Sequence, residues 1–173
     1  RGAYVSLVAG AAVTAAPPAA RASVPSLHLA GSFNKPVGPF DLLPDGRMVV
    51  LSGSDVLVQA SAFSSTFSVA GRVAPGFISS FGAAFISVSP DGSRAAIGNG
   101  EFGAGARLGM LDLNSLSPAA STTPMSTPMN AFSGVWLSGS ELLVAGAETT
   151  GSAVSSVNAD SLARRIVVSN IGG

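Results

Sequence analysis

The stretch Phe85-Ile86-Ser87-Val88-Ser89-Pro90-Asp91-Gly92-Ser93-Arg94-Ala95-Ala96-Ile97 decides the fold. Two short apolar runs flank a Pro-Asp-Gly turn, in which proline fixes φ at about −65° and glycine accepts a positive φ. This pattern is typical of an antiparallel β-hairpin.

The pattern recurs along the chain at a step of about 46 residues. When the repeats are aligned, one column contains Asp45, Asp91 and Ser138. A second similarity supports the same step, because Leu111–Leu116 lies 46 residues before the similar Val157–Leu162. Two independent columns with one period predict a repeat protein built from units of four short strands. We expect strands at 37–43, 47–52, 55–60 and 65–70 in unit one, at 83–89, 93–98, 106–111 and 115–121 in unit two, and at 131–137, 141–146, 153–158 and 164–169 in unit three.

Unit two resembles the "SPDG … D" blade of bacterial YVTN- and TolB-like β-propellers, which are relatives of the WD-repeat proteins. Ser89-Pro90-Asp91-Gly92 and the later Leu108-Gly109-Met110-Leu111-Asp112 carry this resemblance. It implies an all-β fold with three four-stranded blades, at about 37–74, 83–121 and 131–173. Because propellers close with about four to eight blades, three blades imply an incomplete ring and a chain that is part of a longer propeller.

The N-terminal region resembles a targeting signal. Residues 4–16 form an uncharged apolar run, which Pro17-Pro18 and the Ala20-Arg21-Ala22 pattern follow. These features predict a signal peptide at 1–22 and a secreted or periplasmic protein, with an apolar helix packed on a core as the alternative. Residues 23–36 are then a linker, within which 26–33 alternate enough to form an outer strand that closes the ring.

Composition excludes some partners and chemistries. Nine Lys and Arg residues balance nine Asp and Glu residues, which argues against nucleic-acid binding because phosphate neutralisation needs clustered cations. The apolar run is too short for a membrane span, so we expect no transmembrane anchor in this chain. The chain has no Cys, which excludes disulfides and thiolate chemistry.

Most candidate chemical groups have a structural interpretation. Asp45, Asp91, Asp112 and Asn158 fit turn positions, where Asp and Asn oxygens accept hydrogen bonds from nearby backbone N–H groups. The only histidine, His28, has few polar neighbours in the sequence. Gly98-Asn99-Gly100-Glu101-Phe102-Gly103 matches G-x-G-x-x-G, but a strand rather than the required helix is expected after it. We expect four aromatic side chains in the core: Phe40, Phe85, Phe132 and Trp136. Phe77 and Phe81 belong to a connection between units.

The candidate binding residues are Asn99, Glu101, Phe102 and Glu148, because no turn geometry requires them. The loops 98–106, 122–130 and 146–152 are expected to form a ligand face, and the Pro-Asp-Gly turns an inert opposite face. The oxygen atoms of Asn99, Glu101 and Glu148 give a weak indication of Ca²⁺.

Two functions remain open. The first is an exported, non-catalytic propeller that binds a protein, peptide or glycan through its loop face. The alternative is part of an exported propeller enzyme, such as a lactonase, a quinoprotein-like oxidoreductase or another hydrolase, whose catalytic residues lie in other blades.

Overall fold

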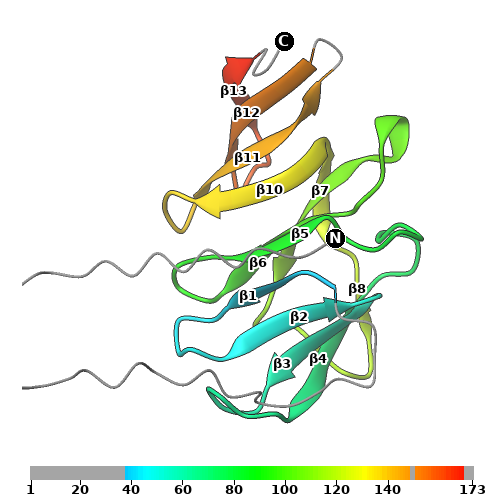
Figure 1. The fold of residues 1–173 in the computed structure, drawn as a ribbon, viewed down its shortest axis with the longest axis vertical. Coiled ribbons are helices and arrows are strands. Elements are labelled where there is room, and N and C mark those ends of the chain that lie inside the picture. The colour runs from blue at the N-terminus through cyan, green and yellow to red at the C-terminus, as the bar shows by residue number, and fades with distance from the viewer. Residues whose placement is uncertain (1–37, 149–150, 170–173) are drawn as a thin grey trace, which may run out of the picture.

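Three antiparallel sheets follow one another along the chain in the computed structural model, which describes residues 38–148 and 151–169. We call them blades one, two and three (Figure 1). Blade one contains β1 (Phe40–Leu42), β2 (Met48–Ser52), β3 (Asp55–Gln59) and β4 (Phe67–Val73). Blade two contains β5 (Phe85–Val88), β6 (Arg94–Gly98), β7 (Arg107–Asp112) and β9 (Met125–Pro128). Blade three contains β10 (Asn130–Trp136), β11 (Glu141–Glu148), β12 (Gly151–Asn158) and β13 (Arg164–Ser169). The predicted all-β class with three blades is confirmed.

One predicted strand is wrong. The fourth strand of blade two is β9 rather than 115–121, because the segment after β7 first crosses to blade one. There β8 (Ser121–Thr122) pairs in parallel with β4, and the Leu116 side chain packs against Gly71. Leu113 and Leu116 of this segment are therefore partly buried against the core between blades one and two.

The three predicted turns all join the first and second strands of their blades, as expected. In blade two the Asp91 carboxylate accepts hydrogen bonds from the Ser89 hydroxyl and from the Ser93 backbone N–H and hydroxyl. The Ser89 bond is the largest of the influences that lower the pKa of Asp91 to about 2. In blade three the Ser138 hydroxyl accepts the Ser140 N–H, which explains how serine replaces the turn aspartate. Asp91 and its replacement in blade three, Ser138, therefore both stabilise their own turns through local hydrogen bonds.

The repeat register changes by one residue within the turn. Leu43 N–H donates to the Arg47 carbonyl in blade one, whereas Ser89 N–H donates to the Arg94 carbonyl in blade two. The turn of blade two is thus one residue longer, and Arg47 is the structural equivalent of Arg94 rather than of Ser93. After this turn, equivalent residues of β2 and β6 lie 47 positions apart.

The second repeat column forms the turn after the third strand. Asp112 Oδ1 accepts the Asn114 N–H at 2.9 Å, and Asn158 Oδ1 accepts the Asp160 N–H at 3.1 Å. The same bond occurs in both blades, one with a carboxylate and the other with an amide. This turn therefore requires a side-chain oxygen that accepts the hydrogen bond, but it does not require a negative charge.

The core lies between the blades. Val49, Leu51 and Val56 pack with Ile97 and Leu111 between blades one and two. Between blades two and three the corresponding cluster contains Phe85, Leu108, Met110, Leu142, Val144 and Val157. Burial of branched aliphatic side chains on both faces of blade two supplies the main driving force for stacking the sheets.

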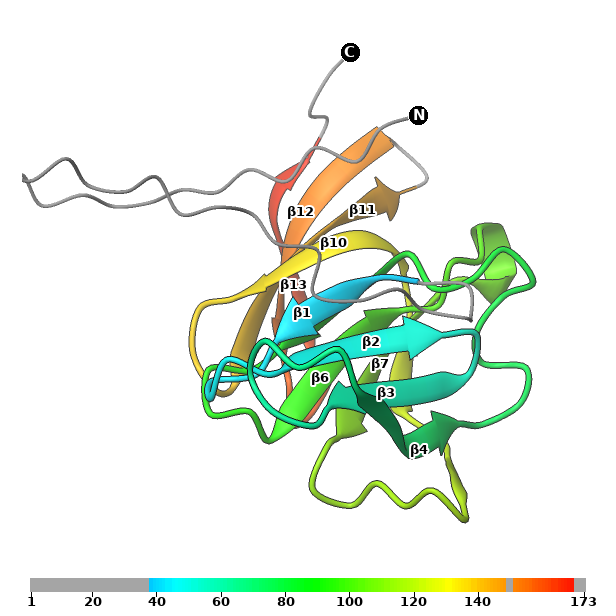
Figure 2. The same ribbon diagram turned by 60° about the horizontal axis from the view of Figure 1, so that its bottom comes forward.

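The first strands β1, β5 and β10 lie side by side (Figures 1 and 2). Asp41 Oδ2 accepts the Val88 N–H at 2.7 Å, and Trp136 Nε1 donates to the Ser87 carbonyl at 3.0 Å. Of the aromatic side chains predicted in the core, Phe85 is buried and Trp136 packs against the core while half-buried. The prediction is wrong for Phe40 and Phe132, which are 52% and 43% exposed. Phe40 alternates with Asp41 and so faces away from blade two, and Phe132 lies at a break in the β10 register.

Several predictions concern residues outside the described ranges: the signal peptide at 1–22, the strand at 26–33 and His28. Within the two ranges that the structure describes, no helix has the length and apolar character needed to cross a bilayer.

Candidate functional site

The loop between β6 and β7 is held in shape by Asn99. This side chain is only 4% exposed. Its Nδ2 donates to the Gly105 carbonyl at 3.0 Å, and its Oδ1 accepts the N–H groups of Arg107 at 2.8 Å and Glu101 at 3.2 Å. The expectation that Asn99 is a surface contact is therefore wrong. Asn99 positions the loop, because one buried amide satisfies three backbone groups.

Further contacts fix the loop from both sides. The Arg107 guanidinium donates to the carbonyls of Ala104 and Ala106, both at 2.8 Å, across the 3₁₀ turn η1 (Gly103–Gly105). Ser79 N–H donates to the Asn99 carbonyl, which ties the loop to the connection between β4 and β5. Strand β7 follows the glycines, so the helix required for dinucleotide binding is not there.

Exposed phenyl rings gather around this loop. Phe102 is 70% exposed, and its ring centroid lies 5.9 Å from that of Phe132 at an interplanar angle of 46°. Phe102 belongs to blade two and Phe132 to blade three, so the pair spans the junction of the two blades. Phe81, 89% exposed, belongs to the connection that contacts the loop through Ser79. We call Phe102 and Phe132 the aromatic patch.

The acidic candidates are placed differently. Glu101 is half-buried in the loop, next to Phe102. Glu148 ends β11 and pairs with Gly151 of β12, and its side chain lies outside the described part of the structure. Its strand end is the blade-three equivalent of the β6–β7 loop, since both join the second and third strands of a blade.

The expected ligand face is smaller than predicted. Residues 122–130 contain β9, and β11 and β12 continue through most of 146–152, so only 98–106 forms a long loop. Asn99 is also unsuited to the predicted role of Ca²⁺ ligand, because its Oδ1 already accepts hydrogen bonds from two backbone N–H groups. Among residues 38–148 and 151–169 there is no group of three His, Asp or Glu side chains suited to a metal ion.

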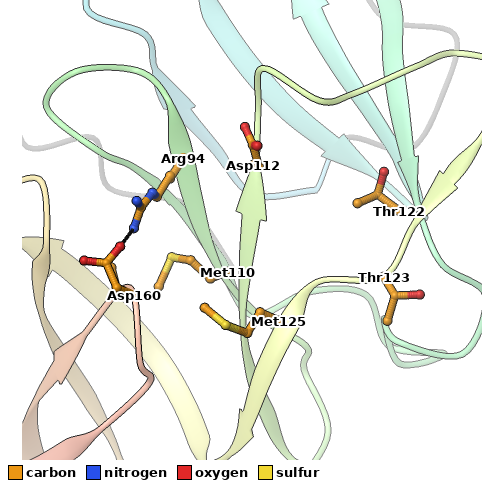
Figure 3. Close-up of a pocket in the computed structure, with 8 residues that line it drawn as sticks. Arg94, Met110, Asp112, Thr122, Thr123, Met125 and Asp160 are labelled. Carbon is orange, nitrogen blue, oxygen red and sulfur yellow. Dashed lines mark hydrogen bonds and ion pairs between the residues drawn. The ribbon is translucent and has the colours of Figure 1, made fainter.

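The opposite face, which carries the Pro-Asp-Gly turns, contains two cavities. One lies between blades two and three, with a volume of about 290 Å³ (Figure 3). The other, of about 410 Å³, lies between blades one and two. The two occupy equivalent places: Arg94 and Asp160 line the first, and their counterparts Arg47 and Asn114 line the second. The sequence predicts that this face is inert. A cavity between two blades is lined by residues that are far apart in the chain, so no local sequence motif marks it.

Comparison with known proteins identifies the fold. No protein-family model matches the chain, and no curated protein matches it. Among solved structures, a putative TolB from Agrobacterium tumefaciens is similar with a TM-score of 0.53 and 17% identity. The match covers 79% of this chain and 47% of that one, so this chain spans about half the length of the TolB-like protein. A chain of a mitotic checkpoint complex is similar with a TM-score of 0.47 and 15% identity, over 76% of this chain and 37% of that chain. The three sheets are thus consecutive blades of a β-propeller-like fold.

Proposed function

We propose that this chain is a non-catalytic binding module whose aromatic patch contacts a protein or peptide partner. The observation that carries the proposal is the exposed Phe102–Phe132 pair, which spans two blades. Large exposed aromatic side chains that lie together are typical of interaction sites, where aromatic residues contribute a large share of the binding energy. Phenyl rings offer no hydrogen-bonding group, which favours apolar side chains of a polypeptide over a glycan.

The rigidity of the β6–β7 loop supports the proposal. Asn99 and Arg107 together make five hydrogen bonds that fix the loop backbone, while Phe102 points into solvent. A loop that is ordered before binding loses less conformational entropy when the partner arrives. The exposed ring contributes little to folding, so its removal tests binding without unfolding the chain.

The test compares two variants that remove the same side chain from opposite faces. Phe102→Ala alters the aromatic patch, and Phe63→Ala removes a 93% exposed ring in the β3–β4 connection, on the turn face. We expect proteins captured from an extract of the source cells by the unaltered chain to be lost with Phe102→Ala and retained with Phe63→Ala. Titration of the purified partner then gives the dissociation constants, with a loss of about 10-fold or more for Phe102→Ala. Equal binding to both variants would contradict the proposal.

We also propose that the chain belongs to a longer exported propeller of the YVTN- or TolB-like type. The SPDG turn and the half-length match to the TolB-like structure support the first part. The apolar run at 4–16 and the Ala20-Arg21-Ala22 pattern support export. N-terminal sequencing of the exported protein is expected to begin at or near Ser23, and a start within the apolar run would contradict export.

A further inference from the structure

The cavity between blades two and three lies on the turn face, at the opposite end of the strands from the aromatic patch. It is lined by the start of β6, the end of β7, the start of β9 and the β12–β13 turn of the next blade. Its volume of about 290 Å³ is at the lower limit of sites for drug-sized ligands, about 300 Å³. A single long side chain therefore fits this cavity better than a whole cofactor does.

Two methionine side chains form the apolar wall of the cavity. Met110 and Met125 are directly paired across β7 and β9, and Figure 3 shows them next to each other. Met110 is buried, whereas Met125 is 47% exposed. Flexible, polarizable thioethers adapt to an alkyl chain that lies along them. The wall therefore suits the methylene groups of an extended side chain.

The rim of the cavity carries an excess of negative charge. Arg94 Nη1 lies 2.5 Å from Asp160 Oδ1, which joins the two blades, and Asp112 is the cross-strand partner of Arg94. The lining residues thus include one guanidinium and two carboxylates, of which Asp160 is paired with Arg94 and Asp112 is in no ion pair among the described residues; both aspartates are exposed. A cationic group complements this rim.

The equivalent cavity between blades one and two serves as an internal control. Where the first cavity has Asp112 and Asp160, the second has Ala60 and Asn114, both neutral. The turn cap that Asp112 provides is made equally by the amide of Asn158. The turn at Asp112 therefore requires no negative charge, and blades one and two pack together with the neutral Asn114 in the place of Asp160.

We propose that this cavity receives a lysine side chain of an extended polypeptide partner. The methylene groups lie along Met110 and Met125, and the ammonium group lies next to Asp112, the carboxylate of the rim that Arg94 does not pair with. A polypeptide is the occupant because β9, which begins at Met125, is the last strand of its sheet. Within the described residues no strand pairs with its outer edge, so its backbone groups are available to an added chain.

The test follows the four methionine methyl groups of the full chain by NMR after isotope labelling of methionine. The probe is the acetylated and amidated peptide Ala-Ala-Lys-Ala-Ala, and the control peptide has norleucine, which keeps the alkyl chain and lacks the charge, in place of lysine. We expect the lysine peptide to shift the Met110 and Met125 signals saturably, with Met48 and Met129 as internal references. Binding should weaken with added salt, because charge attraction at an exposed rim is screened.

The matched variant is Asp112→Asn with Asp160→Asn, which introduces the amides that the chain already uses at Asn158 and Asn114. We expect its dissociation constant for the lysine peptide to rise by about 10-fold or more. A second variant, Asp45→Asn with Glu101→Gln, removes the same net charge elsewhere and should bind as the unaltered chain does. Equal affinity for the norleucine peptide, unchanged affinity in the matched variant, or no shift at Met110 and Met125 would each overturn the proposal. The comparison of the two peptides on the unaltered chain decides the question even if the matched variant folds poorly.

Discussion

Asn99 shows how a residue without a recognisable motif can determine the shape of a surface loop. In the sequence it is one polar residue among glycines, and its side chain could equally face solvent. In the structure it is buried, and its amide satisfies backbone groups on both sides of the loop. Phe102 is the exposed aromatic side chain of this loop, and Asn99 holds the loop backbone around it in place.

We expect Asn99→Ala to lower the free energy of unfolding by about 2 kcal/mol. The substitution leaves backbone groups of Glu101, Gly105 and Arg107 without their partner, and a buried polar group without a hydrogen bond costs about 1–3 kcal/mol. Urea denaturation measures the change, and hydrogen exchange should accelerate at the Glu101 and Arg107 amides. Phe102→Ala, in the same loop, is the control and should change stability by less than about 0.5 kcal/mol. An Asn99→Ala chain as stable as the unaltered one would show that the loop is not held in this way.

At the scale of elements, the segment between β7 and β9 joins two blades. It leaves blade two, pairs β8 with β4 of blade one and returns to form β9. The Thr122 carbonyl also accepts the Ala74 N–H, and Leu116 fills the space beside Gly71. A Cβ on Gly71 would lie 2.9 Å from Leu116 Cδ2, so glycine allows this close approach. β8 thus pairs with the end of β4 at Arg72 and Val73, so this part of the outer edge is not open to pairing with another chain.

Strand β13 has no such cover. It is the last strand of blade three, and Ile166, Val167 and Val168 are each about half exposed. The outer edges of the three blades therefore differ, since β8 pairs with one end of β4 while no described segment pairs with the outer edge of β9 or of β13.

At the scale of the whole molecule, the outward face of blade three carries five apolar side chains beside the polar pair Glu141 and Ser156. Val135, Leu143, Ala145, Val154 and Val168 share this face, because they are cross-strand partners or lie two residues apart. The equivalent face of blade two, with Ala96 and Met110, is buried under blade three. In the longer propeller that we propose, a further blade would cover the outward face of blade three in the same way.

We expect the chain of 173 residues on its own to self-associate as its concentration rises. Val135 and Val168 are 59% and 48% exposed, and exposed apolar side chains on a sheet face next to an open edge favour association. Sedimentation velocity over a concentration series measures this. The double variant Val135→Glu, Val168→Lys should remain monomeric, because it places charges on that face. An unaltered chain that stays monomeric throughout would contradict the expectation.

The sequence by itself determined the blade, because the signals for a blade are local. Gly46 and Gly92 adopt the positive φ that their turns require, and the apolar runs on either side become paired strands. The two aligned columns of the repeat, which contain Asp91 and Asp112, predict the positions of two turns correctly from spacing alone. The same local reasoning identified the 98–106 loop and the exposed Phe102.

Only the tertiary structure decided what lies between blades. The crossing of β8 to blade one, the burial of Asn99, the Phe102–Phe132 pair and the cavity next to Arg94 and Asp160 each depend on residues from distant parts of the chain. Arg94 and Asp160 are 66 positions apart, and no pattern in the sequence predicts their contact. Local hydrogen bonding and apolar alternation specify a turn or a strand, whereas contacts between sheets depend on how the sheets stack.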